Sequence, residues 1–275
     1  MRILYFDCFS GLAGDMTLGA LIDLGLDADR LRGALGTLDL PDWHLEVGHA
    51  TKMGLRGVNV HVVVGGRVEG PAVAAAEHAP HHHHDHPEDH AHHHHHHYAD
   101  VVRCIESGDL PPPVVARARA AFDAIADAEA RVHGCAREQV HFHEVAAVDS
   151  VVDIVGAAYG LWALGVDVVE GAPPPMGRGF VRCAHGRMPL PAPATLEILR
   201  GLPVATCALE RELVTPTGAS FLKAWAQRVG PFPEMVVEGT GWGAGDADFP
   251  DRPNLLRLVL GRTEPAEAAC TQIET

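Results

Sequence analysis

Short apolar runs and alternating apolar and polar positions recur along the chain, and both patterns are typical of β-strands. They predict strands at residues 2–6, 43–50, 58–64, near 168, and at 204–207, 235–238 and 255–260. Turn residues predict one hairpin around Gly54 and a second within residues 178–189, around His185 and Gly186.

Apolar residues spaced three and four apart predict helices at residues 15–24, 99–107, 113–133, 144–166, 192–199 and 217–229. Thr215 is the expected N-cap of the last helix, with Pro216 in its first turn. Hairpins mixed with strand-to-helix connections predict an α+β or mixed α/β fold, in which helices pack on a sheet.

The helix predicted at 144–166 has an apolar stripe expected to face the core, and a second face that carries acids and glycines. Asp149 and Asp153 lie one turn apart on this second face. Gly156 and Gly160 follow them, at positions where another backbone or a ligand can come close.

Length, composition and charge indicate the domain organisation of the chain and the kinds of partner that it can have. With 275 residues and 47% hydrophobic content, the chain is expected to form one domain over residues 1–262, interrupted by a mobile His-rich loop at about 69–98. A net charge of −15 without a basic stripe argues against a nucleic-acid partner. No secretory signal or membrane-length apolar run is present, so no membrane association and a cytoplasmic location are expected. The six cysteines form no C-x-x-C pair and are expected to be free thiols.

Thirteen of the twenty histidines fall between His78 and His97, a segment called the His tract below. Neutral imidazole is a ligand for nickel, copper and zinc alike, so the tract predicts transition-metal binding without selecting the metal. A purification tag is the alternative, but the tract is internal and is interrupted by proline and acids. The expected ligands are His81, His82, His83, His84, His86, His90, His92, His93, His94, His95, His96 and His97.

A second candidate metal or catalytic site surrounds the sequence His141-Phe142-His143. In an extended segment both imidazoles point to one face, which suits bidentate metal binding. Asp149 and Asp153 are expected to complete a nitrogen and oxygen ligand set, or to act with His143 in catalysis. The alternative is that the histidines pack at a strand end and the acids complement a helix dipole.

The loop between the first strand and the first helix is a candidate binding site. Ser10, Gly11 and Gly14 precede a helix N-terminus, where backbone N–H groups can bind an anion such as a phosphate. Asp7 and Asp15 would repel a bare phosphate, so they indicate a divalent ion or a cationic ring nearby. The alternative is that Asp15 is only an N-cap after a tight turn.

Three weaker features complete the candidates. Arg178 and Arg182, with Arg187 nearby, are expected to receive a carboxylate or a phosphate. The helix N-terminus at Thr215, Thr217 and Gly218 offers hydroxyl and N–H donors. The Gly-rich stretch 239–245 is flexible enough to wrap a ligand. Turn and cap chemistry is the alternative for each.

Several long motifs resemble one family. FDCFSGLAGDMTLGALIDLG, the His tract, VHFHEVAAVDSVVDIVGAA, HGRMPLPAPATLEIL, ELVTPTGAS and GWGAGDADFPDRPNLLRL occur in the order typical of the N-terminal part of LarC, the nickel-insertion proteins of nickel-pincer cofactor biosynthesis. The resemblance spans about residues 1–260. One departure is Ala146, where the family usually has glycine.

The resemblance implies a lyase-class enzyme, a CTP-dependent cyclometallase that uses Mn(2+) or Mg(2+). It would insert Ni(2+) into pyridinium-3,5-bisthiocarboxylic acid mononucleotide, through Ni–S and Ni–C bonds, for a lactate racemase-type acceptor. It also implies that residues 263–275 are a tail or linker to a C-terminal domain absent from this chain, or supplied as a separate polypeptide. The competing hypotheses are a non-catalytic nickel storage protein or metallochaperone that acts through the His tract, and a metal-responsive interaction module.

Overall fold

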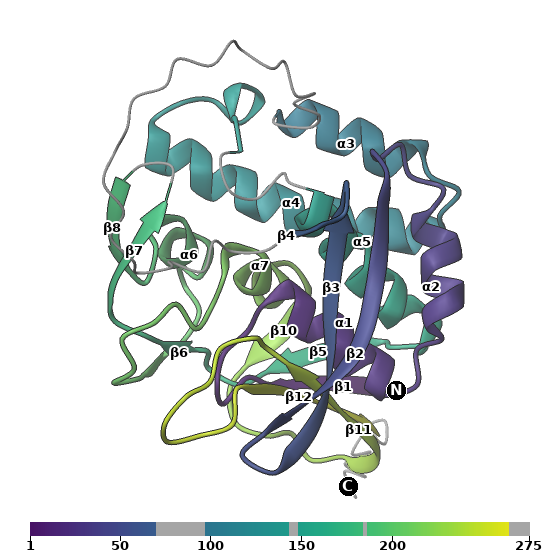
Figure 1. The fold of residues 1–275 in the computed structure, drawn as a ribbon, viewed down its shortest axis with the longest axis vertical. Coiled ribbons are helices and arrows are strands. Elements are labelled where there is room, and N and C mark those ends of the chain that lie inside the picture. Colours follow the sequence, from purple (N-terminus) through teal and green to yellow (C-terminus); the bar gives the residue numbers. More distant parts are fainter. Residues whose placement is uncertain (70–96, 143–147, 184–185, 264–275) are drawn as a thin grey trace, which may run out of the picture.

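A mixed sheet of eight strands is the largest sheet among the described residues, and helices pack against it (Figure 1). This computed structural model describes residues 1–69, 97–142, 148–183 and 186–263. The strands follow the order β10-β5-β1-β12-β11-β3-β2, with β4 paired to β3. Their bounds are β1 Arg2–Asp7, β2 Trp43–Lys52, β3 Leu55–Val64, β4 Arg67–Glu69, β5 Val168–Gly171, β10 Ala226–Val229, β11 Val236–Ala244 and β12 Leu255–Arg262. The predicted mixed α/β class is confirmed.

Seven α-helices and two small sheets complete the described part of the chain. Strand β6 pairs with β9 in parallel, and β7 with β8 form the predicted hairpin. The helices and remaining strands are α1 Gly14–Asp23, α2 Ala28–Leu35, α3 Tyr98–Ser107, α4 Pro112–His133, α5 Val148–Ala163, α6 Pro193–Ile198, α7 Pro216–Trp225, β6 Pro175–Met176, β7 Gly179–Cys183, β8 Gly186–Leu190 and β9 Ala205–Thr206, with a short 3-10 helix at Arg137–Gln139.

Helix α1 lies directly on strand β11, and the glycines of β11 make this possible. A Cβ on Gly241 would lie 2.0 Å from the carbonyl oxygen of Ala20, and one on Gly243 would lie 1.7 Å from that of Met16. Only glycine admits a helix backbone this close. The prediction that residues 239–245 form a flexible ligand loop is therefore wrong for residues 239–244, which belong to β11.

Helix α5 is buried on nearly every side, rather than along one stripe only. Its Gly156 and Gly160 receive leucine side chains, among them Leu18 and Leu21 of α1. These glycines therefore serve helix packing rather than ligand access. The burial of this face places Asp153 inside the protein, at 9% exposed.

Two further elements differ from the prediction. The helix predicted at 217–229 ends at Trp225, because residues 226–229 pair in parallel with β5 as strand β10. Helix α2 was not predicted, although Asp27 caps it by accepting from the N–H groups of Asp29 and Arg30. Tertiary strand pairing overrode helix propensity in the first case.

Residues 70–96, with most of the His tract and the predicted mobile loop, lie outside the described residues. Strand β4 ends at Glu69 before this segment, and α3 begins at Tyr98 after it. None of the described helices combines the length and apolar character needed to cross a membrane.

Candidate functional site

A buried carboxylate from helix α5 lies at the N-terminus of helix α1. A Cβ on Gly14 would lie 2.2 Å from Oδ2 of Asp153, so glycine leaves the room that this carboxylate occupies. The positive end of the α1 dipole favours a negative group at this point. The other oxygen, Oδ1, is buried without a hydrogen-bond partner among the described residues. A buried polar atom in this state is costly and calls for a functional explanation.

Asp153 and Asp15 form what we call the carboxylate pair, because the charge of Asp15 raises the pKa of Asp153. Burial raises the pKa of Asp153 well above its usual value, and the charges of Asp15 and Asp149 add to this. A hydrogen bond from the backbone N–H of Asp15 partly opposes the increase. Burial also raises the pKa of Asp15 to about 6. A carboxylate whose pKa lies nearer to neutral pH binds an abstracted proton more readily, which suits a general base.

A polar group from β3 and the β11–β12 connection lies beside Asp15, and sequence reasoning missed it. The carboxylate of Asp246 raises the pKa of Asp15, whereas His61 lowers it. Nε2 of His61 lies 3.5 Å from Oδ1 of Asp246. The side-chain amide of Asn59 donates to the same oxygen at 3.1 Å. The available signal was that Asn59 and His61 stand two residues apart, on one face of a strand whose neighbouring residues 58, 60 and 62–64 are all valine.

The donors of the loop before α1 are engaged within the protein. The buried Ser10 hydroxyl donates to the Pro253 carbonyl at 2.6 Å. The Gly11 N–H donates to Cys8, and the Leu12 N–H donates to Leu213 at 2.8 Å. Gly11 is needed because a Cβ would lie 2.4 Å from the Leu213 carbonyl oxygen. These donors therefore have partners within the protein, and anion binding at Ser10 and Gly11 stays a prediction.

Asp7 forms an ion pair with Arg257. Its Oδ2 accepts from Nε of Arg257 at 2.8 Å and from the Nη2 of the same guanidinium. This ion pair joins neighbouring strands β1 and β12. The expected role of Asp7 as a metal ligand beside Asp15 stays a prediction. For Asp15, the N-cap alternative is wrong, because Ala13 occupies the cap position.

The N-terminus of α7 confirms the predicted cap and has little room for a ligand. Oγ1 of Thr215 accepts from the Gly218 N–H at 3.1 Å. A Cβ on Gly218 would lie 2.2 Å from the Leu12 carbonyl oxygen, and Thr217 is 7% exposed. These residues join α7 to the loop before α1.

Two of the predicted arginines, Arg178 and Arg187, lie at the surface. Arg178 forms an exposed ion pair with Glu210 at 3.7 Å. Arg187 lies over the ring of Phe180, 4.2 Å from its centroid. Arg182 belongs to β7, but its side chain lies outside what the structure describes.

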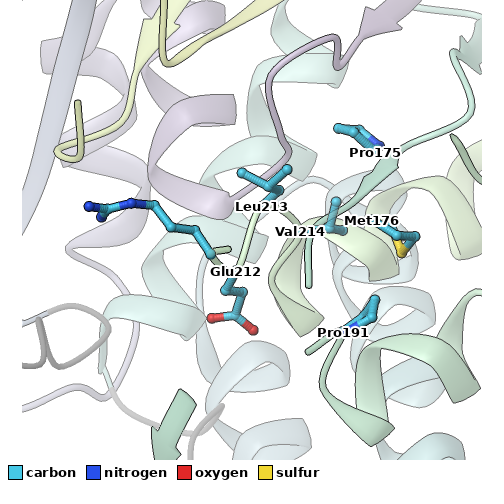
Figure 2. Close-up of a pocket in the computed structure, with 8 residues that line it drawn as sticks. Pro175, Met176, Pro191, Glu212, Leu213 and Val214 are labelled. Carbon is cyan, nitrogen blue, oxygen red and sulfur yellow. The ribbon is translucent and has the colours of Figure 1, made fainter. Parts of the chain in front are cut away.

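A hollow of about 10 Å³ is lined by residues of β6 and of the segment that precedes α7. Figure 2 shows Leu213 and Val214 beside Pro175 and Met176, with Pro191 near them. Sites for small molecules usually measure roughly 300–1,000 Å³. In this conformation the hollow is therefore too small for a mononucleotide.

The predicted grouping of both histidines of His141-Phe142-His143 with the aspartates stays a prediction. Phe142 is buried against Phe122, whereas His141 is exposed, as the predicted alternation requires. His143 and residues 144–147 lie outside the described residues. Within the described ranges, no three His, Cys, Asp or Glu side chains are placed to hold a metal ion.

The thirteen histidines of the His tract are typical of a protein that handles a transition-metal ion, because imidazole is a common ligand of such ions. Comparison with known proteins is more specific: residues 4–275 match the family described as "Nickel insertion protein". The chain belongs to this family, which confirms the resemblance of its motifs. No solved structure matched the chain.

Three relatives illustrate the match. The "pyridinium-3,5-bisthiocarboxylic acid mononucleotide nickel insertion protein" of Geobacillus kaustophilus (strain HTA426) is 45% identical over 261 residues, which are 95% of this chain and 60% of that protein. The protein of the same name from Desulfitobacterium hafniense (strain DSM 10664 / DCB-2) is 44% identical over 261 residues, 95% of this chain and 58% of its own length. A "putative nickel insertion protein" of Myxococcus xanthus (strain DK1622) is 46% identical over 266 residues, 96% and 62% respectively. The chain thus spans about three fifths of the length of these relatives.

Proposed function

We propose that this chain takes part in inserting Ni(2+) into pyridinium-3,5-bisthiocarboxylic acid mononucleotide, as a cytoplasmic lyase-class cyclometallase. The names of its relatives and the order of its motifs support this proposal. Nickel and the mononucleotide are both substrates in this reaction. The product would serve a lactate racemase-type acceptor.

The observation that carries the proposal is the buried Asp153 carboxylate with its unpartnered Oδ1. When nickel bonds to a ring carbon, the C–H bond breaks, its electron pair forms the Ni–C bond, and the proton must be accepted. A general base works best when its pKa lies near the operating pH. Burial moves Asp153 and Asp15 toward that range. We assign the proton acceptor to the carboxylate pair, with His143 as the further candidate.

Three features of the surroundings affect the position and the charge of this base. Gly14 leaves room for Asp153, and the N-terminus of α1 stabilises its negative form. Asp246, held by Asn59 and close to His61, places a second negative charge beside Asp15. The acidic environment also suits a cationic pyridinium ring.

CTP and its divalent ion, Mn(2+) or Mg(2+), are assigned to the C-terminal domain that the resemblance implies, in the same polypeptide or a separate one. The sequence contains two lysines, and both are engaged in the structure. Lys52 donates to the Asp246 carbonyl at 2.8 Å and to Asp248 at 2.7 Å, whereas Lys223 donates to the Arg200 carbonyl at 2.8 Å. Neither is available as a triphosphate clamp of the Walker type.

The test is a nickel-insertion assay with the mononucleotide, Ni(2+), CTP and Mg(2+), in which the C-terminal domain of a relative is added in trans. Product is measured by mass spectrometry. Asp153→Asn is expected to slow metallation by about 10²–10⁴-fold, the range typical of a removed general base. Asp42→Asn, at an exposed position, is the matched control. An unchanged rate in Asp153→Asn would remove the carboxylate pair from the mechanism.

The second candidate function is nickel storage or delivery, favoured by the thirteen histidines of the His tract. It predicts that the chain binds several Ni(2+) ions but that no metallated product forms even with the added domain. The same assay therefore separates the two functions.

A further inference from the structure

The last histidine of the His tract lies against the first histidine of His141-Phe142-His143. His97 and His141 form an isolated antiparallel β-bridge. Their ring centroids are 3.9 Å apart, with an angle of 52° between the ring planes. Both residues are exposed. Two imidazoles far apart in sequence are thus neighbours at the surface.

The chain on both sides of this histidine pair is anchored in the protein. The Tyr98 N–H donates to the Val140 carbonyl at 3.4 Å, and the Tyr98 hydroxyl donates to the carboxylate of Asp123. Phe142 is buried beside Phe122, with 6.3 Å between ring centroids. The flanking residues therefore fix the two backbones, while both imidazoles remain accessible to solvent.

We propose that His97 and His141 form a two-nitrogen Ni(2+) site, at which the folded domain receives nickel from the His tract. Imidazole nitrogens bind transition metals at about 2.0–2.1 Å, so small side-chain rotations bring both rings to one ion. Water fills the remaining coordination positions. The site lies at one end of the tract, and on its other side the chain continues toward α5 with Asp149 and Asp153. Only the direction of transfer rests on the proposed function; nickel binding by the pair does not.

The test is protection of His141 from diethyl pyrocarbonate, which modifies imidazoles that carry no metal. The metal-free full chain is titrated with Ni(2+), modified briefly and digested with trypsin. The peptide that follows Arg137 contains His141 but no residue of the tract, so tandem mass spectrometry measures this site separately. Half-protection of His141 gives the free Ni(2+) concentration at which the site fills.

His97→Ala is expected to raise that concentration at least about tenfold, because one of two linked ligands is lost. His49→Ala, which removes an exposed histidine on β2, is the matched control and should leave it unchanged. Thermal melting of each metal-free variant verifies the fold. His141 that stays reactive while the tract fills, or protection that is equal in His97→Ala and the unmodified protein, would overturn the proposal.

Protection of His141 by Ni(2+) does not depend on whether the chain catalyses metallation. Protection of His141 without any metallated product would uphold the pair and remove the proposed function. Metallation that proceeds while His141 stays unprotected would uphold the proposed function and exclude the nickel site at His97 and His141.

Discussion

Replacing Asp15 with Asn is expected to stabilise the protein at neutral pH and to change little in acid. Burial raises the pKa of Asp15 from 3.8 to about 6 in the folded protein. An acid whose pKa rises on folding binds its proton more tightly in the folded state, so stability is lost as the pH rises from about 4 through 6. Asn has nearly the same shape and carries no charge, so the variant escapes this loss.

The magnitude follows from the same pKa values. The difference between 3.8 and about 6 corresponds to about 3 kcal/mol above pH 7, at about 1.4 kcal/mol per pH unit. Asp15 is partly exposed, and solvent screens its charge, so we expect about half of this, roughly 1.5 kcal/mol. Replacing Asp153 acts in the same direction, because burial raises its pKa as well.

Urea unfolding at intervals between pH 4.5 and 7.5 measures the effect. The free energy of unfolding of Asp15→Asn, relative to the unmodified protein, should rise across this range. Asp42→Asn at an exposed position controls for the general loss of one negative charge. The double variant with Asp153→Asn should gain less than the sum of the single variants, because each carboxylate penalises the other. A gain that is independent of pH, or strict additivity, would refute the reasoning.

The remaining predictions concern the tract, the His-x-His motif and the packing glycines. Deleting residues 78–96 should change the melting temperature of the metal-free protein by no more than about 2 °C in calorimetry, because a segment of this composition buries little apolar surface. The same deletion should greatly reduce the amount of bound Ni(2+). A melting temperature lower by many degrees would contradict this prediction. His143→Ala should abolish metallation while calorimetry shows unchanged nickel binding by the tract; retained metallation would exclude His143. Gly243→Ala should destabilise by about 1–3 kcal/mol or more in urea unfolding, because its Cβ would meet the α1 backbone. Gly33→Ala, where the Cβ meets nothing within 4 Å, should instead stabilise α2 by up to about 1 kcal/mol, and equal effects at both glycines would contradict the packing argument.

Several elements could be predicted because their causes lie within a few residues. The turn at Met53 and Gly54 has positive φ at both positions, as a tight hairpin between strands requires. Gly134 ends α4 in the left-handed conformation that glycine adopts readily. Thr215 caps α7 through its own side chain. Such features are decided by local stereochemistry and hydrogen bonding.

The candidate site was only partly predictable. Its chemistry was visible, because Asp15 and Asp153 were both named from their motifs. Their meeting at the N-terminus of α1 was not, since it depends on how α5 packs against α1. His61 and Asp246 were missed because they lie on different elements and share no local motif.

The sequence by itself therefore determined the class of fold, the family and the kinds of side chain available for metal and proton chemistry. Tertiary structure alone decided which of them meet, which donors are engaged internally, and which glycines exist for packing. Ser10 and Gly11 read locally as an anion site, yet the contacts of their loop with Leu213 and Pro253 engage them. The physical reason is that hydrogen-bond partners and burial are set by residues distant in the chain, and these contacts fix both the availability of a polar group and its pKa.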